Sequence, residues 1–187
     1  MTDTDAPRDL ALIAVFAALA AVMSFVVIPV GPVPITLQTL AVILAGIILG
    51  PVRGFLSVAL WVVVGLIGAP VFAGGTGGLS TLAGPTAGYL LSFPFAALVA
   101  GGLVSVLHRA FARRALAAAV FLAGLVGLAL SHALGIIGLM WSQQTPFKDA
   151  FLGDLMFWPG DLAKNVLAVV IALAVFKAFP RIRHGLS

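Results

Sequence analysis

Long apolar stretches, separated by short breaks rich in charge, proline or glycine, run through almost the whole chain. A transmembrane helix needs about 20 predominantly apolar residues, and six such helices with short loops account for nearly all of the chain. The pattern predicts helices over residues 10–28, 35–49, 55–67, 89–107, 116–141 and 161–179. We therefore expect an all-α integral membrane protein with six transmembrane helices, folded as a single domain over residues 1–187.

Composition supports this assignment to the membrane. Of the 187 residues, 62% are hydrophobic and 9% are charged, and the mean hydropathy is +1.22, whereas soluble domains carry about a quarter charged residues. The net charge is +4, but the basic residues lie at the ends of apolar runs, which argues against a nucleic-acid partner. Cysteine is absent, so the sequence offers no disulfide, no thiol nucleophile and no cysteine-ligated metal.

The basic residues also predict an orientation, because arginine and lysine accumulate on the cytoplasmic side of membrane proteins. With six spans, eight basic residues fall on the cytoplasmic side and one, Lys148, falls on the outer side. Lys164 is not counted. The eight are Arg8, Arg53, Arg109, Arg113, Arg114, Lys177, Arg181 and Arg183. This split predicts cytoplasmic N and C termini. The N-terminus lacks a basic leader, so we expect the first segment to be retained.

Two connectors between the apolar runs are irregular. Residues 29–34 (PVGPVP) form a proline-rich connector that cannot be helical. Residues 68–88 hold seven glycines and no charge, which is unusual because loops in water normally carry polar residues. We interpret this segment as a lid that presses on the protein or on a ligand, with a flexible connector as the alternative. In the six-span orientation both connectors and the start of the last helix lie on the outer face.

The most distinctive polar pair is Asp161 and Lys164, at the start of the last apolar run. Pro159–Gly160 is expected to break the preceding structure, so that the helix begins near Asp161. Residues three apart share one face of a helix, and ionisable groups at membrane depth are costly unless they face a cavity. We therefore place a binding site here, with a simple helix cap and salt bridge as the alternative. Nearby polar residues are Thr36, Gln38, Thr39 and Asn165.

Other candidate chemistry is sparse. His132 lies alone inside an apolar run, where an interhelical hydrogen bond is a commoner role than a proton relay. No spacing of His, Asp or Glu fits a metal site, and the catalytic motifs HExxH and GxSxG are absent. The sequence therefore predicts neither an enzyme nor a bound cofactor or metal.

The first apolar run carries two pairs of small residues, Ala14/Ala18 and Ala17/Ala21. Small residues at this spacing let another helix approach closely within lipid. The partner helix could belong to another protein or to this chain.

Five motifs together resemble one known family. They are GPVPITLQT at 31–39, LGPVRG at 49–54, GAPVFAGGTGG at 68–78, GPTAGYL at 84–90 and PGDLAK at 159–164. In this order, and over nearly the whole chain, they resemble the BioY family, the biotin-specific substrate-binding (S) components of energy-coupling factor (ECF) transporters. One small departure is Ala87, where a second glycine is common.

The resemblance implies a six-helix S-component fold in the bacterial cell membrane that captures biotin from outside with high affinity. It also implies a transmembrane coupling (T) protein and two cytoplasmic ATPases as partners. In the family, the coupling protein docks on small residues of helix one, which correspond here to Ala14, Ala17, Ala18 and Ala21. The cytoplasmic basic residues are expected to contact these partners or anionic membrane lipid. Some members are suspected of transporting alone.

The chemistry of biotin fits the polar pair. Asp161 can accept N–H groups of the ureido ring, and Lys164 can donate either to the ureido carbonyl or to the carboxylate. Gln38, Thr36, Thr39 and Asn165 are further candidate contacts, and Phe72, Gly74, Gly75 and Tyr89 are expected to cover the ring. Alternatives are an S component for another vitamin such as thiamine or riboflavin, a membrane enzyme, and a structural assembly subunit. An aromatic-lined site for a cationic ligand would require more Trp and Tyr on the outer face, whereas the chain has one Tyr.

Overall fold

The computed structural model describes residues 6–29, 33–110 and 115–179. For residues 108–110 it describes the backbone and not the side chains. These residues form α-helices, two short strands and two 3₁₀ turns. The helices are α1 (Ala6–Met23), α2 (Gln38–Leu49), α3 (Pro51–Leu66), α4 (Ala87–Ala110), α5 (Leu116–Gln143), α6 (Phe147–Leu155) and α7 (Trp158–Ala178). The strands are β1 (Val27–Ile28) and β2 (Ile35–Thr36), and the 3₁₀ turns are η1 (Ala73–Gly75) and η2 (Leu79–Ala83). The centre of the proline connector and Arg113, Arg114, Arg181 and Arg183 lie outside the described residues.

The all-helical prediction is correct, but the number of membrane-spanning helices is wrong. Four of the described helices are long and apolar enough to cross a membrane: Ala6–Met23, Ala87–Leu107, Leu116–Gln143 and Trp158–Ala178. Helix α2 has 12 residues and α3 has 16. At 1.5 Å per residue they extend about 18 Å and about 24 Å, less than the ~30 Å of a hydrocarbon core. The charge count that placed both termini in the cytoplasm assumed six spans and no longer supports that placement.

Helix α2 shows why hydropathy alone predicts too many membrane-spanning helices. Every residue from 40 to 49 is buried inside the protein, and α2 contacts α1, α3, α4, α5 and α7. A helix that is apolar on all sides can be surrounded by lipid or by other helices. The surrounding helices, not lipid, cover α2, which places it at the centre of the fold.

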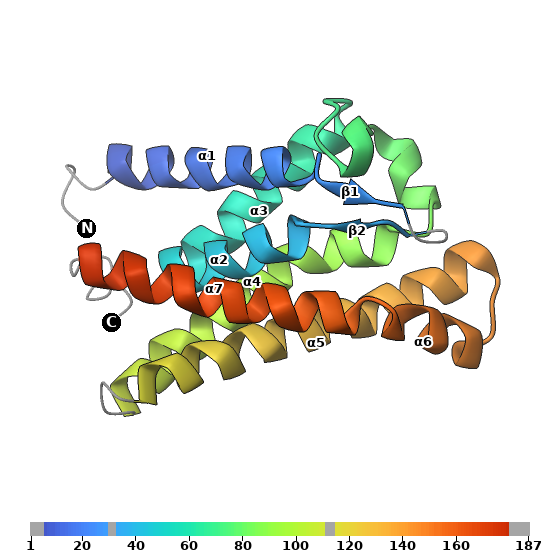
Figure 1. The fold of residues 1–187 in the computed structure, drawn as a ribbon. Helices are drawn as coiled ribbons and strands as arrows, with labels where there is room; N and C mark the ends of the chain where they lie inside the picture. Colours follow the sequence, from blue (N-terminus) through green and yellow to red (C-terminus); the bar gives the residue numbers. More distant parts are fainter. Residues whose placement is uncertain (1–5, 30–32, 111–114, 180–187) are drawn as a thin grey trace.

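The helices lie roughly side by side, and the irregular segments gather at one end (Figure 1). The first described residues of α1 and the last of α7 lie together at the left of this view, and the β1–β2 hairpin, the segment with η1 and η2, and α6 lie at the right. In the hairpin Val27 pairs with Thr36 and Ile28 with Ile35. The proline connector, the glycine-rich segment and the start of the last helix therefore converge at one end, as the sequence predicts.

Two helix starts differ from expectation, and proline is the reason in both. The gap left at 50–54 between two predicted helices is limited to Gly50, and α3 begins directly at Pro51. Helix α7 begins at Trp158, so that Pro159 and Gly160 lie in its first turn and do not precede it. Proline is favoured at the first helical positions, where its missing N–H costs nothing. Asp161 is consequently not the helix cap, since its own N–H already bonds to the carbonyl of Phe157 at 2.9 Å.

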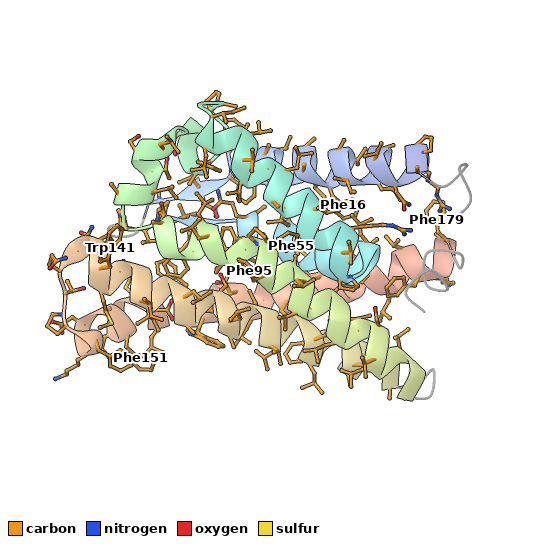
Figure 2. The ribbon with its side chains drawn as sticks, turned by 180° about the vertical axis from the view of Figure 1, so that it is seen from behind. Phe16, Phe55, Phe95, Trp141, Phe151 and Phe179 are labelled. Atoms are coloured by element: carbon orange, nitrogen blue, oxygen red, sulfur yellow. The ribbon has the colours of Figure 1, made fainter. Side chains whose placement is uncertain are left out.

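The outer surface of the helices is apolar over much of its length. Large hydrophobic side chains are exposed on α1, α3, α4, α5 and α7, and Phe55 of α3 packs edge-on against Phe95 of α4 with ring centroids 5.5 Å apart. Exposed Trp141 and Phe151 lie at the same end as the hairpin, and Phe16 and Phe179 lie toward the other end (Figure 2). Tryptophan at the end of an apolar helix, as Trp141 is in α5, is typical of positions near the lipid headgroups.

Candidate ligand-binding site

A cavity of about 320 Å³ lies where the hairpin, the glycine-rich segment and helices α2, α4, α5 and α7 meet. This volume is at the small end of the range for ligand pockets. Its lining comes from parts of the chain that are distant in sequence, within residues 33–39, 72–93, 132 and 157–164. The lining residues are Val33, Pro34, Ile35, Thr36, Gln38, Thr39, Phe72, Ala73, Thr76, Thr81, Pro85, Thr86, Tyr89, Leu90, Phe93, His132, Phe157, Asp161 and Lys164.

One wall of the cavity carries the acid–base pair. Lys164 Nζ lies 2.6 Å from Asp161 Oδ1, and the hydroxyl of Thr39 donates to the same oxygen at 2.7 Å. Lys164 also donates to Thr39 Oγ1 at 3.2 Å. The Lys164 side chain is 13% exposed and that of Asp161 is 5% exposed, so both groups are largely shielded from solvent. At low dielectric such charged hydrogen bonds are strong, and this wall can offer both an acceptor and a donor to a ligand.

Gln38 lines the cavity, but its amide is already engaged within the protein. Its Oε1 accepts from Thr36 Oγ1 at 3.1 Å, and its Nε2 donates to Ser24 Oγ at 3.0 Å. Ser24 in turn donates to the carbonyl of Ala20. This chain of hydrogen bonds ties the end of α1 to β2 and α2. Gln38 therefore holds the cavity wall together, and Thr36 is one of its supports.

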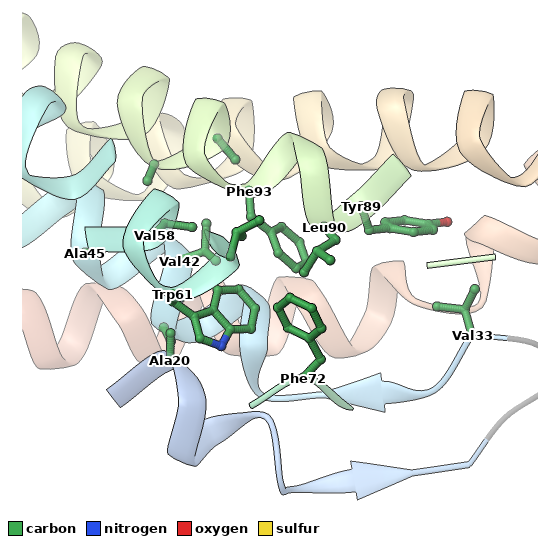
Figure 3. Close-up of a cluster of buried hydrophobic side chains, with 14 of the residues drawn as sticks. Ala20, Val33, Val42, Ala45, Val58, Trp61, Phe72, Tyr89, Leu90 and Phe93 are labelled. Atoms are coloured by element: carbon green, nitrogen blue, oxygen red, sulfur yellow. The ribbon is translucent and has the colours of Figure 1, made fainter. Parts of the chain in front are cut away.

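Aromatic side chains form another part of the lining, and one of them, Phe72, comes from the glycine-rich segment. Phe72 is 2% exposed, and it reaches toward Trp61 and Phe93 (Figure 3). Phe72 meets Trp61 edge-on with centroids 5.6 Å apart, while Trp61 stacks on Phe93 at 6.0 Å. The Phe72 ring fits against Gly65 of α3, where a Cβ atom would collide with it. The segment is thus fastened onto the helices, as expected for a lid.

The glycines of this lid set its backbone conformation and do not line the cavity. Gly74 and Gly75, expected to cover a ligand, are not among the lining residues, whereas Phe72, Ala73 and Thr76 are. Gly74 and Gly75 have φ of 68° and 77°, a region that favours glycine. The turn they make brings the N–H of Gly74 to 3.4 Å from the carbonyl of Ser24, so the lid also contacts the end of α1.

The structure separates Asn165 from the rest of the polar cluster. Asn165 is 1% exposed and does not line the cavity. Its Nδ2 donates to the carbonyl of Phe121 at 3.0 Å, and a Cβ at Gly124 would collide with its Oδ1. Asn165 therefore joins α7 to α5. Of the other candidates, Asp161, Lys164, Gln38, Thr36, Thr39, Phe72 and Tyr89 all line the cavity.

Two buried residues that the sequence analysis did not assign to the site belong to it. His132 lines the cavity, and Asp154 lies behind it with no exposure. His132 Nδ1 lies 2.8 Å from Asp154 Oδ1, and its Nε2 lies 3.2 Å from Asp161 Oδ2. Asp154 lies between the predicted helices 116–141 and 161–179, in a connector that the sequence analysis did not assign to the site. The one local signal is the nearby Trp158, which begins the next helix and whose Nε1 donates to Asp154 Oδ2 at 3.1 Å.

The alanines of α1 face in different directions. Ala14 and Ala18 are exposed, Ala17 is buried, and Ala21 packs against the core. The pair Ala17/Ala21 thus contacts this chain's own helices. The pair Ala14/Ala18 remains on the outer surface.

Apolar helices around a small cavity lined by an ionic pair and by aromatic side chains define a membrane protein with a site suited to a small ligand. The family model for the BioY family matches residues 1–181, and the chain belongs to the BioY family.

Several relatives are similar over nearly their whole length. The chain is 41% identical over 167 residues to a probable biotin transporter BioY of Pyrococcus horikoshii, covering 88% of this chain and 94% of that one. It is 42% identical over 184 residues to the biotin transporter BioY of Rhodobacter capsulatus, covering 92% and 95%. A crystal structure described as the S-component for biotin from an ECF-type ABC transporter superposes with a TM-score of 0.88 at 31% identity, covering 95% of both chains.

Family membership confirms the resemblance noted in the sequence. The relatives are transporters and not enzymes, in agreement with the expectation from the missing catalytic motifs. The apolar helices and the family together identify a multi-pass protein of the cell membrane.

Proposed function

We propose that this chain binds biotin and acts as the high-affinity substrate-capture subunit of an ECF-type vitamin transporter. The observation that carries the proposal is the Asp161–Lys164 pair in the wall of a cavity of about 320 Å³ that aromatic side chains also line. Biotin has a ureido head with N–H donors and a carbonyl acceptor, an apolar ring and tail, and a carboxylate. A site lined by an ionic pair and by aromatic side chains complements both parts of such a molecule.

Within this site, Asp161 accepts an N–H of the ureido head, and Lys164 donates to the ureido carbonyl or to the carboxylate. Lys164 has three N–H groups, and two of them are used by Asp161 and Thr39, which leaves one for the ligand. Phe72 and Tyr89 cover the apolar ring from the lid and from α4. Thr39 and Gln38 fix the polar wall from the side of α2.

Uptake requires a path into the cavity, and we assign this to the end where the lid and the hairpin lie (Figure 1). Biotin enters there from the outer side of the membrane. The lid residues Thr76, Thr81 and Thr86 line this part of the cavity with uncharged hydroxyl groups.

Transport by such a subunit needs partners, and this part of the proposal rests on the similarity to the crystal structure of an S-component from an ECF-type ABC transporter. The partners would be a transmembrane coupling protein and two cytoplasmic ATPases. Ala14 and Ala18 support a docking surface on α1, since both are small and exposed and α1 is the least buried of the long helices.

The test is to identify the small molecule that co-purifies with the protein by mass spectrometry, and then to titrate ligand-free protein with biotin, thiamine and riboflavin. Saturable binding of biotin alone supports the proposal. Binding of another vitamin in preference to biotin, or of none, overturns it. Uptake measured in proteoliposomes without the partner proteins would identify a transporter that works alone.

A further inference from the structure

A buried carboxylate behind the cavity gathers donors from three helices. Asp154 of α6 accepts from the Tyr89 hydroxyl at 2.7 Å, from the Trp158 indole at 3.1 Å, and faces His132 Nδ1 at 2.8 Å. It has no exposed surface. A carboxylate so far from water is tolerated only when it is hydrogen-bonded and its charge is balanced.

His132 connects this carboxylate to the one in the cavity wall. Its Nδ1 faces Asp154 and its Nε2 lies 3.2 Å from Asp161 Oδ2, although the geometry at Nε2 falls short of a hydrogen bond. Trp158 stacks on the imidazole with centroids 4.5 Å apart, and Tyr89 meets it edge-on at 6.4 Å. These two rings hold the orientation of the imidazole.

The proton count of this group follows from the geometry. A neutral imidazole has one N–H and one lone pair, so it would turn its lone pair toward one of the two carboxylates. With both nitrogens protonated, each faces an acceptor. The positive charges of His132 and Lys164 then balance the negative charges of Asp154 and Asp161, with Tyr89 as the neutral donor beside them.

We propose that His132 and Asp154 are positioning residues for the ligand: Asp154 holds His132, and His132 keeps Asp161 Oδ2 at the cavity wall as an ionised acceptor. Oδ1 already receives Thr39 and Lys164, so Oδ2 is the oxygen with capacity for a ligand N–H. This inference rests on the proposed function, since it takes Asp161 as the acceptor that meets the ligand. A supporting group whose orientation is locked by packing is what precise binding sites require.

The alternative is that the cluster only joins helices α4 to α7. The chain offers a matched control, because Ser92 of α4 and Ser131 of α5 form a buried 2.8 Å hydrogen bond one residue away from His132. Neither serine lines the cavity. Ser131→Ala therefore removes a buried interhelical hydrogen bond without touching Asp161.

The experiment compares biotin affinity in purified wild-type protein, His132→Asn, His132→Gln and Ser131→Ala. Asparagine can still donate to Asp154 but has no atom at the place of Nε2, whereas glutamine can put an N–H there. We expect His132→Asn to weaken binding about tenfold or more and His132→Gln to weaken it less, as for loss of a buried charged partner. Ser131→Ala should stay within about twofold of the wild type, as for a change remote from the site.

A double-mutant cycle with Asp161→Asn tests whether His132 acts through Asp161. If it does, His132→Asn costs less than about threefold in affinity once Asp161 is already replaced, because the two changes remove the same interaction. If His132→Asn does not fold, Asp154→Asn takes its place in the cycle with the same expectation. Absence of biotin binding by the wild type overturns the proposed function. If the wild type binds, an unchanged affinity in His132→Asn, or an equal loss in both backgrounds, overturns this inference.

Discussion

The hydroxyl of Thr39 donates a 2.7 Å hydrogen bond to Oδ1 of Asp161, a residue 122 positions further along the chain. This bond joins the first turn of α2, the helix at the centre of the fold, to the first turn of α7. Because Lys164 bonds to both partners, the three side chains form a closed triangle in the cavity wall. The position of the ionic pair is therefore fixed by the core of the protein.

Replacing Thr39 by valine keeps the shape of the side chain and removes the hydroxyl from this triangle. We expect biotin binding to weaken by about 1–2 kcal/mol, since a hydrogen bond to a charged group in a buried site is lost. Isothermal titration of the purified variant measures this. Thr145→Val is a suitable control, because the Thr145 hydroxyl makes only a 3.5 Å bond to the carbonyl of Leu139 and does not line the cavity. Equal affinities of Thr39→Val and the wild type would exclude a role for the triangle.

A Cβ atom added at Gly65 would collide with the ring of Phe72. Gly65→Ala should therefore displace the lid, lower the unfolding temperature and weaken biotin binding, with a cost of about 1–3 kcal/mol in stability and in binding, as for an overpacked core. In α4, a Cβ at Gly102 meets nothing within 4 Å, so Gly102→Ala should be neutral or slightly stabilising. Thermal unfolding and ligand titration of both variants check this. If the two variants behaved alike, Phe72 would not be what fastens the lid.

Substitutions on α1 can distinguish assembly with the coupling protein from ligand binding. Ala18 is exposed and Ala17 is buried. We expect Ala18→Trp to leave biotin affinity unchanged and to abolish co-purification with the coupling protein, because a large side chain prevents close helix approach. Ala17→Trp should destabilise the subunit itself, by several kcal/mol for a side chain of that size forced into a packed interior. Normal assembly of Ala18→Trp would place the docking surface elsewhere.

Much of this architecture could be read from the chain. The apolar runs mark every long helix, and the spacing of Asp161 and Lys164 predicts their pairing on one face. Their 2.6 Å contact does lie at a cavity wall. The convergence of the proline connector, the lid and the start of α7 at one end was also predicted, although from a six-span topology that is wrong.

The features that the sequence did not predict depend on contacts between residues that are distant in sequence. Helix α2 is as apolar as a lipid-facing helix, and hydropathy does not distinguish lipid from the protein that covers it. For this reason the six-span prediction failed. Asp154 lies in a connector to which the sequence analysis gave no role, yet it is the most deeply buried acid of the described chain. Its three donors come from α4, α5 and α7, and only the tertiary fold brings them together.

The decisive measurement is the affinity for biotin of Asp161→Asn, taken beside that of Asp149→Asn. Asp161 faces the cavity, whereas Asp149 is exposed on α6. We expect Asp161→Asn to weaken binding by about 2 kcal/mol or more, which is about 30-fold, because one partner of a buried charged hydrogen bond is removed. Asp149→Asn should bind as the wild type does. A folded Asp161→Asn protein that binds biotin as tightly as the wild type would show that this carboxylate does not hold the ligand.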